Sequence, residues 1–396
     1  MGISKQLRVD MVHGSWIRKM FDEGLRLKAI HGAANVFDFT LGNPYVDPPP
    51  EFLTALKRAA AEERHGIHAY MQNCGFPEVR AKVAAELSAE LGFGFTAGSV
   101  VMTVGAAGAL NVLLKSLLDP GDEVVLVAPF FPEYAFYIRN HSGVAVVSTA
   151  DDTFLPDLED LDRKIGPHTR AMILNSPCNP SGRVVTPEVL SGLGDLLRRK
   201  SAENGRTIYL LSDEPYRRLL FDGRTYPSPF GHYAHTILAT SHSKDLSLAG
   251  ERIGYLAIGP ECEDAADIFA AATFCNRTLG YVNAPALMQR VLLYMDSYQP
   301  NVAIYQRKRD RLFEVLTGMG YEIIKPEGTF FMFPKSPIPD DPKWVEVLAR
   351  ERVLVTPGTG FAFPGYFRIS FAVDDTVIEG SFPGFERALK SVRQSA

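Results

Sequence analysis

Residues 100–128 read VVMTVGAAGALNVLLKSLLDPGDEVVLVA, and they constrain the architecture more than any other segment. Residues 100–104 form a β-branched apolar run typical of a buried strand, and residues 106–118 have the apolar spacing of a helix. We expect that helix to end at Asp119-Pro120-Gly121, because proline cannot continue a helix and glycine favours a turn. A second apolar run covers residues 123–128. Strand, helix and strand in this order predict a βαβ unit with two parallel strands.

The same alternation continues along the chain, with a helical stretch after Pro132. Five further strand-like runs follow the first two, at residues 144–148, 171–174, 207–211, 236–240 and 252–258. The last two runs are too close for a crossover helix, so one strand there should be antiparallel. We therefore predict an α/β fold whose large domain has a mostly parallel seven-stranded sheet sandwiched by helices.

Outside this block the pattern changes. Residues 284–318 predict a long helix broken near Gln299-Pro300, and residues 320–396 mix short strands with helices. The first 30 residues predict an arm with one amphipathic helix at about 15–28. The domain prediction that follows is an arm with part of a small domain (1–45), a large domain (46–290) and a small C-terminal domain (291–396). The small domain is then α+β and takes both chain ends.

Composition limits the function classes. The 396 residues carry 41 Lys and Arg against 46 Asp and Glu, a net charge of −5, with 46% hydrophobic and 22% charged residues. These values are typical of a globular protein, and the lack of a basic block argues against nucleic acid as a partner. The four cysteines include no CxxC pair and are too few for a disulfide framework. They are Cys74, Cys178, Cys262 and Cys275.

The N-terminal residues have no apolar core of a secretory signal, so a cytoplasmic protein is expected. One uncharged stretch, residues 91–114, is long enough to span a membrane. Its five glycines disfavour one long helix, and a turn, a strand and a buried helix fit it better. We expect no membrane partner.

Several common site motifs are absent. His65 and His68 have no third ligand at a useful spacing, so no metal is expected. The chain has no Walker A sequence, no GxGxxG after a strand and no GxSxG elbow.

Polar or small residues instead follow several of the predicted strands, at the sheet edge where α/β proteins bind ligands. Gly105–Gly108 open a helix with bare backbone N–H groups that suit a phosphate, although packing also favours small residues there. The loop 175–182, NSPCNPSG, holds amide side chains rigidly between prolines. Asp213 follows the next strand and is either a helix cap or a buried acid with a function.

Two cations complete this set. Lys244 lies among small polar residues just past the strand 236–240, with Arg252 eight residues further on. Burial beside an arginine would lower the pKa of this lysine and leave a free amine for imine chemistry. Arg368 lies inside the apolar run FRISF, where an arginine needs an anionic partner such as a substrate carboxylate.

Taken together and in order, the motifs NxPxNPSG, SDEPY, SxSK…GERIGY and FRISFA resemble the fold-type-I pyridoxal-phosphate enzymes, and most of all the class I/II aminotransferases of the aspartate aminotransferase superfamily. The resemblance extends from Leu41 to Arg368. It implies pyridoxal 5'-phosphate as cofactor, bound by residues 46–290, and ping-pong transfer of an amino group from an L-amino acid to a 2-oxo acid. Aspartate or glutamate, aromatic and small neutral amino acids all stay open as substrates.

The resemblance also implies roles for single residues. Lys244 would form the Schiff base with the cofactor and then carry the proton, Asp213 would pair with the pyridine nitrogen, and Arg368 would bind the substrate α-carboxylate. Other expected cofactor or substrate contacts are Tyr216 and Asn179 at the ring oxygen, Gly42 near the substrate, and Gly105, Ala106, Ala107, Ser241, Ser243 and Arg252 at the phosphate. Tyr70 would reach the phosphate in the neighbouring subunit, which implies a homodimer with shared active sites.

Three positions depart from the family pattern or are ambiguous. Phe131 takes the ring-stacking position that is often tryptophan, so an indole N–H is lost there. Ala107 takes a position where one bacterial subgroup has a lysine for dicarboxylic substrates. Arg277 falls within one position of a partner-subunit arginine that binds a second carboxylate, but the residues alone favour a solvated or structural arginine.

Two alternatives stay open beside the transaminase. A C–S β-lyase of the same fold would use almost the same residues. A non-catalytic sensor domain with the aminotransferase fold is the other, although the complete set from lysine to arginine argues against it.

Overall fold

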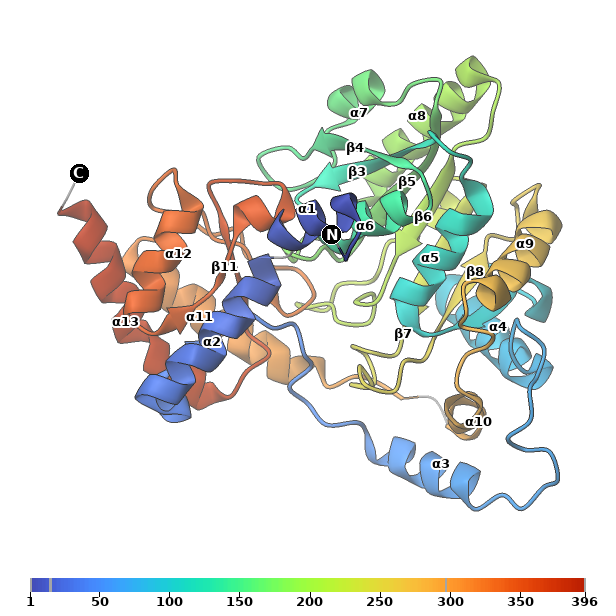
Figure 1. Cartoon of the computed structure of the whole chain (residues 1–396), viewed down its shortest axis with the longest axis horizontal. Coiled ribbons are helices and arrows are strands. Elements are labelled where there is room, and N and C mark those ends of the chain that lie inside the picture. The colour runs from blue at the N-terminus through green and yellow to red at the C-terminus, as the bar shows by residue number, and fades with distance from the viewer. Residues whose placement is uncertain (1, 14–15, 296–297, 395–396) are drawn as a thin grey trace.

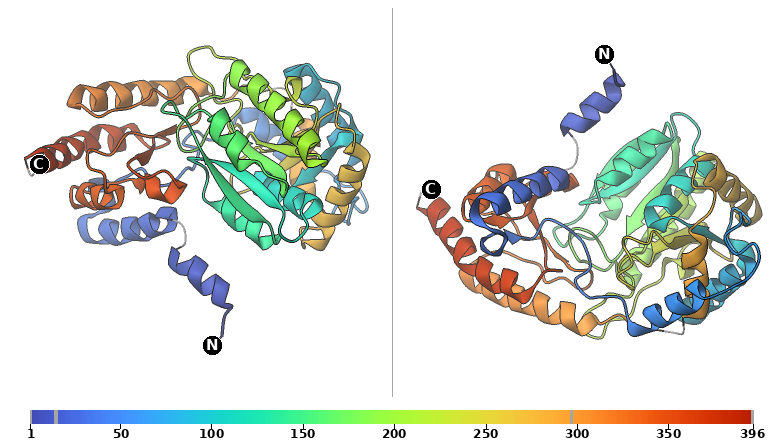
Figure 2. Two further views of the ribbon diagram at one scale, coloured as in Figure 1. Left: turned by 90° about the horizontal axis from the view of Figure 1, so that it is seen from above. Right: turned by 60° about the horizontal axis from the view of Figure 1, so that its bottom comes forward.

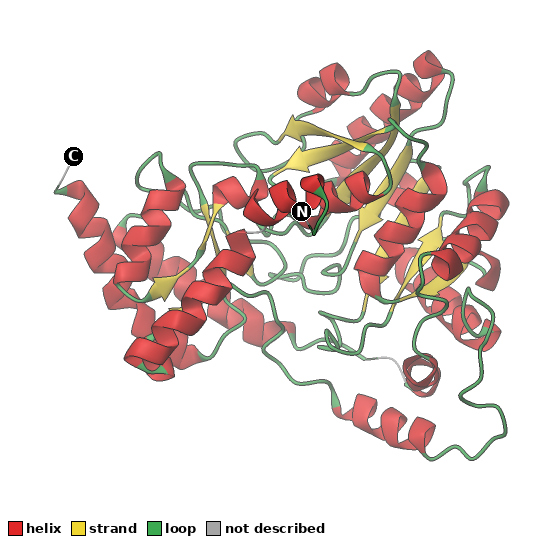
Figure 3. Cartoon of the chain, in the orientation of Figure 1, coloured by secondary structure: helices red, strands yellow, loops and turns green. Residues whose placement is uncertain are grey.

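The protein is described by a computed structural model that covers residues 2–13, 16–295 and 298–394. Its main feature is a large sheet, whose strands are yellow in Figure 3. The sheet has seven strands in the order β2-β8-β7-β6-β5-β3-β4. The strands are β2 (Val100–Thr103), β3 (Glu123–Ala128), β4 (Val144–Thr149), β5 (Thr169–Asn175), β6 (Tyr209–Asp213), β7 (Thr236–Ser241) and β8 (Gly254–Ile258). The predicted α/β class with seven strands is confirmed.

Strand β8 is antiparallel to both of its neighbours, β2 and β7, and the other neighbouring pairs in this sheet are parallel. Only twelve residues separate Ser241 from Gly254, which is too short for a helical crossover. The predicted antiparallel strand is therefore confirmed, and it has a consequence for function. Arg252, at the start of β8, lies at the same sheet edge as the carboxyl ends of the parallel strands.

Helices cover both faces of the sheet (Figure 1). One face packs against α5 (Gly105–Leu117), α6 (Glu133–Asn140) and α9 (Ala265–Thr278). The opposite face packs against α7 (Leu158–Lys164) and α8 (Pro187–Asn204), and further along against α3 (Pro50–Ala60), α4 (Pro77–Leu91) and α10 (Ala286–Tyr294). The strands are buried on both sides, which explains their continuous apolar sequences.

A second hydrophobic core takes residues from both chain ends, with Phe39, Trp344 and Phe385 at its centre. Its helices are α2 (Trp16–His31), α11 (Val302–Met319), α12 (Asp341–Arg350) and α13 (Asp375–Arg393). Its strands are β1 (Phe37–Asp38), β9 (Phe331–Met332), β10 (Val353–Leu354), β11 (Thr356–Pro357) and β12 (Phe367–Ser370). Figure 2 shows these helices gathered on one side and the large sheet on the other. The domain boundaries at 45/46 and 290/291 stay a prediction.

The break expected near Gln299-Pro300 is present, because α10 ends at Tyr294 and α11 begins at Val302. The arm differs from expectation. It holds α1 (Lys5–His13) in addition to α2, and an ion pair of Asp10 with Arg139 of α6 joins α1 to the large sheet's helices. Helix α1 is short and its Leu7 and Met11 are exposed, so no buried face marks it in the sequence.

The uncharged segment 91–114 folds as predicted into a turn, the strand β2 and the start of the buried helix α5. Among the described helices, none is long and apolar enough to cross a membrane.

Candidate active site

A cavity of about 310 Å³ lies at the carboxyl edge of the parallel strands, between the large sheet and the core of the chain ends. The predicted site residues that line it are Gly42, Ala106, Ala107, Phe131, Asn179, Asp213, Tyr216, Ser241, Ser243, Lys244, Arg252 and Arg368. Gly105, the first residue of α5, is buried against Arg252 at the cavity edge. The strand-end motifs meet because parallel strands bring their carboxyl ends to one edge.

Lys244 is half-buried and its amine donates a hydrogen bond of 2.5 Å to the carbonyl oxygen of Gly42. The amine also lies over the rings of Tyr216 and Phe330. Burial, followed by the positive charges of Arg368 and Arg252, lowers the pKa of Lys244 to about 8. The lowered pKa agrees with the sequence argument, but Arg368 contributes more than the arginine eight residues away.

Asp213 ends β6 and is 6% exposed. Its Oδ2 accepts a hydrogen bond from the hydroxyl of Tyr134, and its Oδ1 is buried with no partner. Burial raises the pKa of Asp213 to about 7, although the hydrogen bond from Tyr134 opposes this. Because a buried polar atom without a partner is unfavourable, the free oxygen of Asp213 can accept a hydrogen bond from an N–H group, or pair with a cation, that enters the cavity.

Arg368, on β12, is 2% exposed and brings positive charge into the cavity. Its Nη1 donates to Oδ1 of Asn179 at 3.0 Å, its Nη2 donates to the carbonyl of Thr40 at 2.6 Å, and its Nε has no partner. The rings of Phe331 and Phe361 lie 4.5 and 4.8 Å from the guanidinium carbon. Among the described residues no carboxylate pairs with Arg368, so its charge is available to an anion.

The loop of Asn179 is fixed by Asn175, which ends β5. Oδ1 of Asn175 accepts from the backbone N–H of Asn179 at 2.7 Å, and its Nδ2 donates to the carbonyl of Asp213 at 2.8 Å. These two bonds tie the NSPCNPSG loop to the neighbouring strand β6. The amide of Asn179 is thereby held between Arg368 and the cavity.

Small residues and Arg252 form the other end of the cavity. Gly105 has a φ of +81°, and an added Cβ there would lie 2.8 Å from Nη2 of Arg252. Arg252 donates to the carbonyls of Val104 and Ala249, which aims its guanidinium at the N-terminus of α5. Backbone N–H groups, two serine hydroxyls and a guanidinium together make an anion-binding end of the cavity.

Two predicted site residues lie outside the cavity. Tyr70 is 89% exposed, and Arg277 is exposed with its guanidinium over the ring of Phe274.

In the described part of the chain no group of three His, Cys, Asp or Glu side chains could hold a metal ion, and His65 and His68 are both exposed.

The cavity lining also includes residues that the sequence analysis did not assign to the site. Tyr134 and Tyr137 of α6 line the cavity beside Phe131, and so do Asn43 and Phe331. The ring of Tyr134 meets that of Phe131 edge-on at 5.6 Å. The spacing of three residues between Tyr134 and Tyr137 was the available signal, because residues three apart share one helix face.

A mostly parallel sheet with a half-buried lysine amine and a buried arginine at its carboxyl edge suits an enzyme whose substrate carries both an amine and a carboxylate. Comparison with known families names the class: the family "Aminotransferase class I and II" matches residues 34–380, so the chain belongs to it and is a transaminase.

The chain is 34% identical to the aspartate/prephenate aminotransferase of Thermus thermophilus over 358 residues, 88% of this chain and 90% of the relative. An amino transferase from Eubacterium rectale has a TM-score of 0.95 at 37% identity, covering 99% of each chain. The aspartate aminotransferase of Thermus thermophilus, solved with maleate, has a TM-score of 0.86 at 30% identity over 98% of this chain and 100% of that one.

Proposed function

We propose that the protein is a pyridoxal 5'-phosphate-dependent aminotransferase that moves an amino group from an L-amino acid to a 2-oxo acid in two half-reactions. The observation that carries this proposal is the pairing of Lys244 and Arg368 in one cavity. The first supplies an amine whose pKa is about 8, and the second supplies a buried positive charge without a carboxylate partner. An amino acid needs both, one for chemistry at Cα and one for its α-carboxylate.

The residues present fit this cofactor. The unpartnered Oδ1 of Asp213 would take the pyridine nitrogen, and the space beside Gly105, which a Cβ would fill, would take the phosphate. Ala106, Ala107, Ser241, Ser243 and Arg252 would complete the phosphate site, Asn179 and Tyr216 would bind the ring oxygen, and Phe131 would cover one ring face. When bound, the cofactor supplies an electron sink for the negative charge left at Cα after proton removal.

The protein's own groups then have separate tasks. Arg368, steadied by Asn179 and the carbonyl of Thr40, binds the α-carboxylate with its planar fork and so fixes the direction of the Cα–H bond. The amine of Lys244 would take the proton from Cα of the substrate and return it to C4′ of the cofactor, which suits a group with a pKa near neutral pH. Asp213 would keep the cofactor nitrogen protonated, and the aromatic side chains of Phe131, Tyr137 and Phe331 line the cavity and exclude water.

We infer a homodimer with shared active sites. Tyr70 is almost fully exposed and does not line its own cavity, as expected for a residue that completes the site of a second copy. Mass measurement in solution tests the dimer, and mixing Tyr70→Phe with Lys244→Ala protein tests the sharing. In the mixed dimer one site would carry both changes and the other neither, so activity should reappear if Tyr70 acts across the interface.

The side chain of the substrate poses a separate question. The cavity of this chain offers three cations, Lys244, Arg252 and Arg368, and each has a task already. We propose that a dicarboxylic substrate, such as aspartate, depends on Arg277 of a second copy. Arg277→Leu should then lower kcat/KM for aspartate and leave the value for alanine or phenylalanine unchanged.

We also place the enzyme in the cytoplasm, because all four of its cysteines are unpaired thiols. The division into domains at 45/46 and 290/291 is proposed on the separate cores of the chain ends and the large sheet.

A panel of half-reactions tests the proposed function. Protein loaded with pyridoxal phosphate is mixed with single amino acids, and loss of the lysine-bound cofactor's visible absorbance is followed. Lys244→Ala should lack that absorbance. Accumulation of pyruvate and ammonia without any 2-oxo acid would overturn the transaminase in favour of the β-lyase.

A further inference from the structure

A polar cluster behind Lys244 is not explained by the catalytic chemistry. We call residues 241–254, which run from the end of β7 to the start of β8, the lysine loop. Asp245 follows the lysine directly, and its Oδ2 accepts a hydrogen bond from the hydroxyl of Tyr298 and lies 3.3 Å from Nδ1 of His242. Its Oδ1 accepts from the backbone N–H of Leu246 at 2.8 Å. Neither Asp245 nor Tyr298 lines the catalytic cavity.

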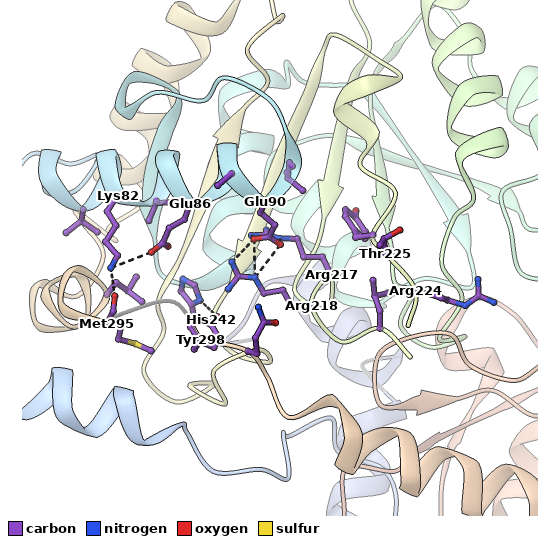
Figure 4. Close-up of a pocket in the computed structure, with 18 residues that line it drawn as sticks. Lys82, Glu86, Glu90, Arg217, Arg218, Arg224, Thr225, His242, Met295 and Tyr298 are labelled. Atoms are coloured by element: carbon purple, nitrogen blue, oxygen red, sulfur yellow. Dashed lines mark hydrogen bonds and ion pairs between the residues drawn. The ribbon is translucent and has the colours of Figure 1, made fainter. Parts of the chain in front are cut away.

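The cluster continues to helix α4. Nη1 of Arg218 lies 3.7 Å from Oδ2 of Asp245. Arg218 also donates to Glu90, which accepts from Nε of Arg217 at 2.9 Å as well (Figure 4). The guanidinium of Arg218 lies 5.2 Å from the centre of the Tyr298 ring. The cluster borders a second cavity of about 660 Å³, which is separate from the catalytic one. Asp245 is therefore connected through Arg218 and Glu90 to helix α4.

Tyr298 belongs to the linker between α10 and α11. Helix α10 packs in the core of the large sheet, and α11 packs in the core of the chain ends. The hydroxyl of Tyr298 thus connects this linker to the lysine loop. Burial raises the pKa of Asp245, but His242, Arg218 and Tyr298 bring it down to about 2, so the acceptor is ionised at working pH. A hydrogen bond to an ionised acceptor is of the stronger kind.

The lysine loop therefore makes hydrogen bonds with Tyr298 on one side and lines the catalytic cavity on the other. His242 and Asp245 contact the linker, whereas Ser241, Ser243 and Lys244 line the catalytic cavity. We propose that Tyr298, through Asp245, is a positioning residue that fixes the lysine loop so that the amine of Lys244 faces the catalytic cavity. This role rests on the proposed function of Lys244.

Tyr298→Phe removes the hydroxyl and keeps the ring that packs under Arg218. Hydrogen exchange in the cofactor-free protein is the first readout. The amide of Leu246, which bonds to Asp245, should exchange about tenfold faster or more, the expected cost of losing a hydrogen bond to a charged group. The second readout is the pH titration of the lysine-bound cofactor's absorbance, whose midpoint should move by about half a unit or more.

Tyr294→Phe is the matched control, because Tyr294 lies at the end of α10 with its ring under Arg58, and among the described residues its hydroxyl makes no hydrogen bond to the lysine loop. It should leave both readouts unchanged. Asp245→Asn, which keeps the shape and removes the charge, should repeat both effects of Tyr298→Phe. Wild-type exchange and titration in both cluster variants would overturn the positioning role. Absence of the visible band in the wild-type protein would instead overturn the proposed function.

Discussion

The hydroxyl of Tyr134 donates a hydrogen bond to one oxygen of Asp213 and leaves the other oxygen buried without a partner. The two residues come from different layers, since Tyr134 belongs to α6 and Asp213 ends β6. The bond fixes the carboxylate plane, and it favours the ionised form against burial. The free oxygen is the one that would face the cofactor nitrogen.

Tyr134→Phe should weaken cofactor binding, and the loss should grow as the pH falls. Burial already raises the pKa of Asp213 to about 7, and removal of the donor raises it further. Only the ionised carboxylate pairs with a protonated nitrogen, so the pH midpoint of binding moves upward. We expect about tenfold weaker binding at pH 7, measured by spectroscopic titration between pH 6 and 9.

Tyr233→Phe is the control for that experiment. It removes a buried tyrosine hydroxyl that donates to the carbonyl of Ile208, away from the cavity. Its melting temperature should fall while the pH midpoint of binding stays. An unchanged midpoint in Tyr134→Phe as well would contradict the link to Asp213.

The rate at which cofactor-free protein takes up pyridoxal phosphate should follow the titration of Lys244. The neutral amine attacks the aldehyde, and burial with Arg368 and Arg252 lowers the pKa of this amine to about 8. Below that pH the rate should fall about tenfold per unit, and above it the rate should level off. Arg368→Gln removes the charge that lowers this pKa more and should move the midpoint upward. A midpoint near the ordinary lysine value of about 10.4 would contradict the burial argument.

The sequence was informative wherever the determinant is local. The predicted bounds of β3 are those found, because an apolar run lies between Gly121 and Pro129. The strand-end motifs could be placed together because parallel strands share one carboxyl edge. The contact of Tyr134 with Asp213 spans 79 residues and two layers, so no local pattern contains it. The charge that lowers the pKa of Lys244 most is that of Arg368. Arg368 lies far from Lys244 in the sequence, so no local pattern shows this effect either.

Arg368→Lys should distinguish the effect of the positive charge at this position from the effect of the planar guanidinium. A lysine keeps the positive charge but loses the planar fork that reaches a carboxylate, Asn179 and Thr40 together. We expect kcat/KM to fall about 10- to 100-fold, while the pH midpoint of cofactor uptake stays near 8 because the charge is kept. Arg311→Lys, at an exposed arginine paired with Glu379, is the control and should leave kcat/KM unchanged.

Gly105→Ala should damage the phosphate end of the cavity. The backbone φ of +81° costs an alanine about 1–2 kcal/mol, and the new Cβ would lie 2.8 Å from Nη2 of Arg252 and push that side chain away. We therefore expect a lower melting temperature and cofactor binding weakened by about tenfold. Gly94→Ala is the control, because nothing lies within 4 Å of a Cβ there. If Gly105→Ala loses stability but binds the cofactor and inorganic phosphate like the wild type, the phosphate belongs elsewhere in the cavity.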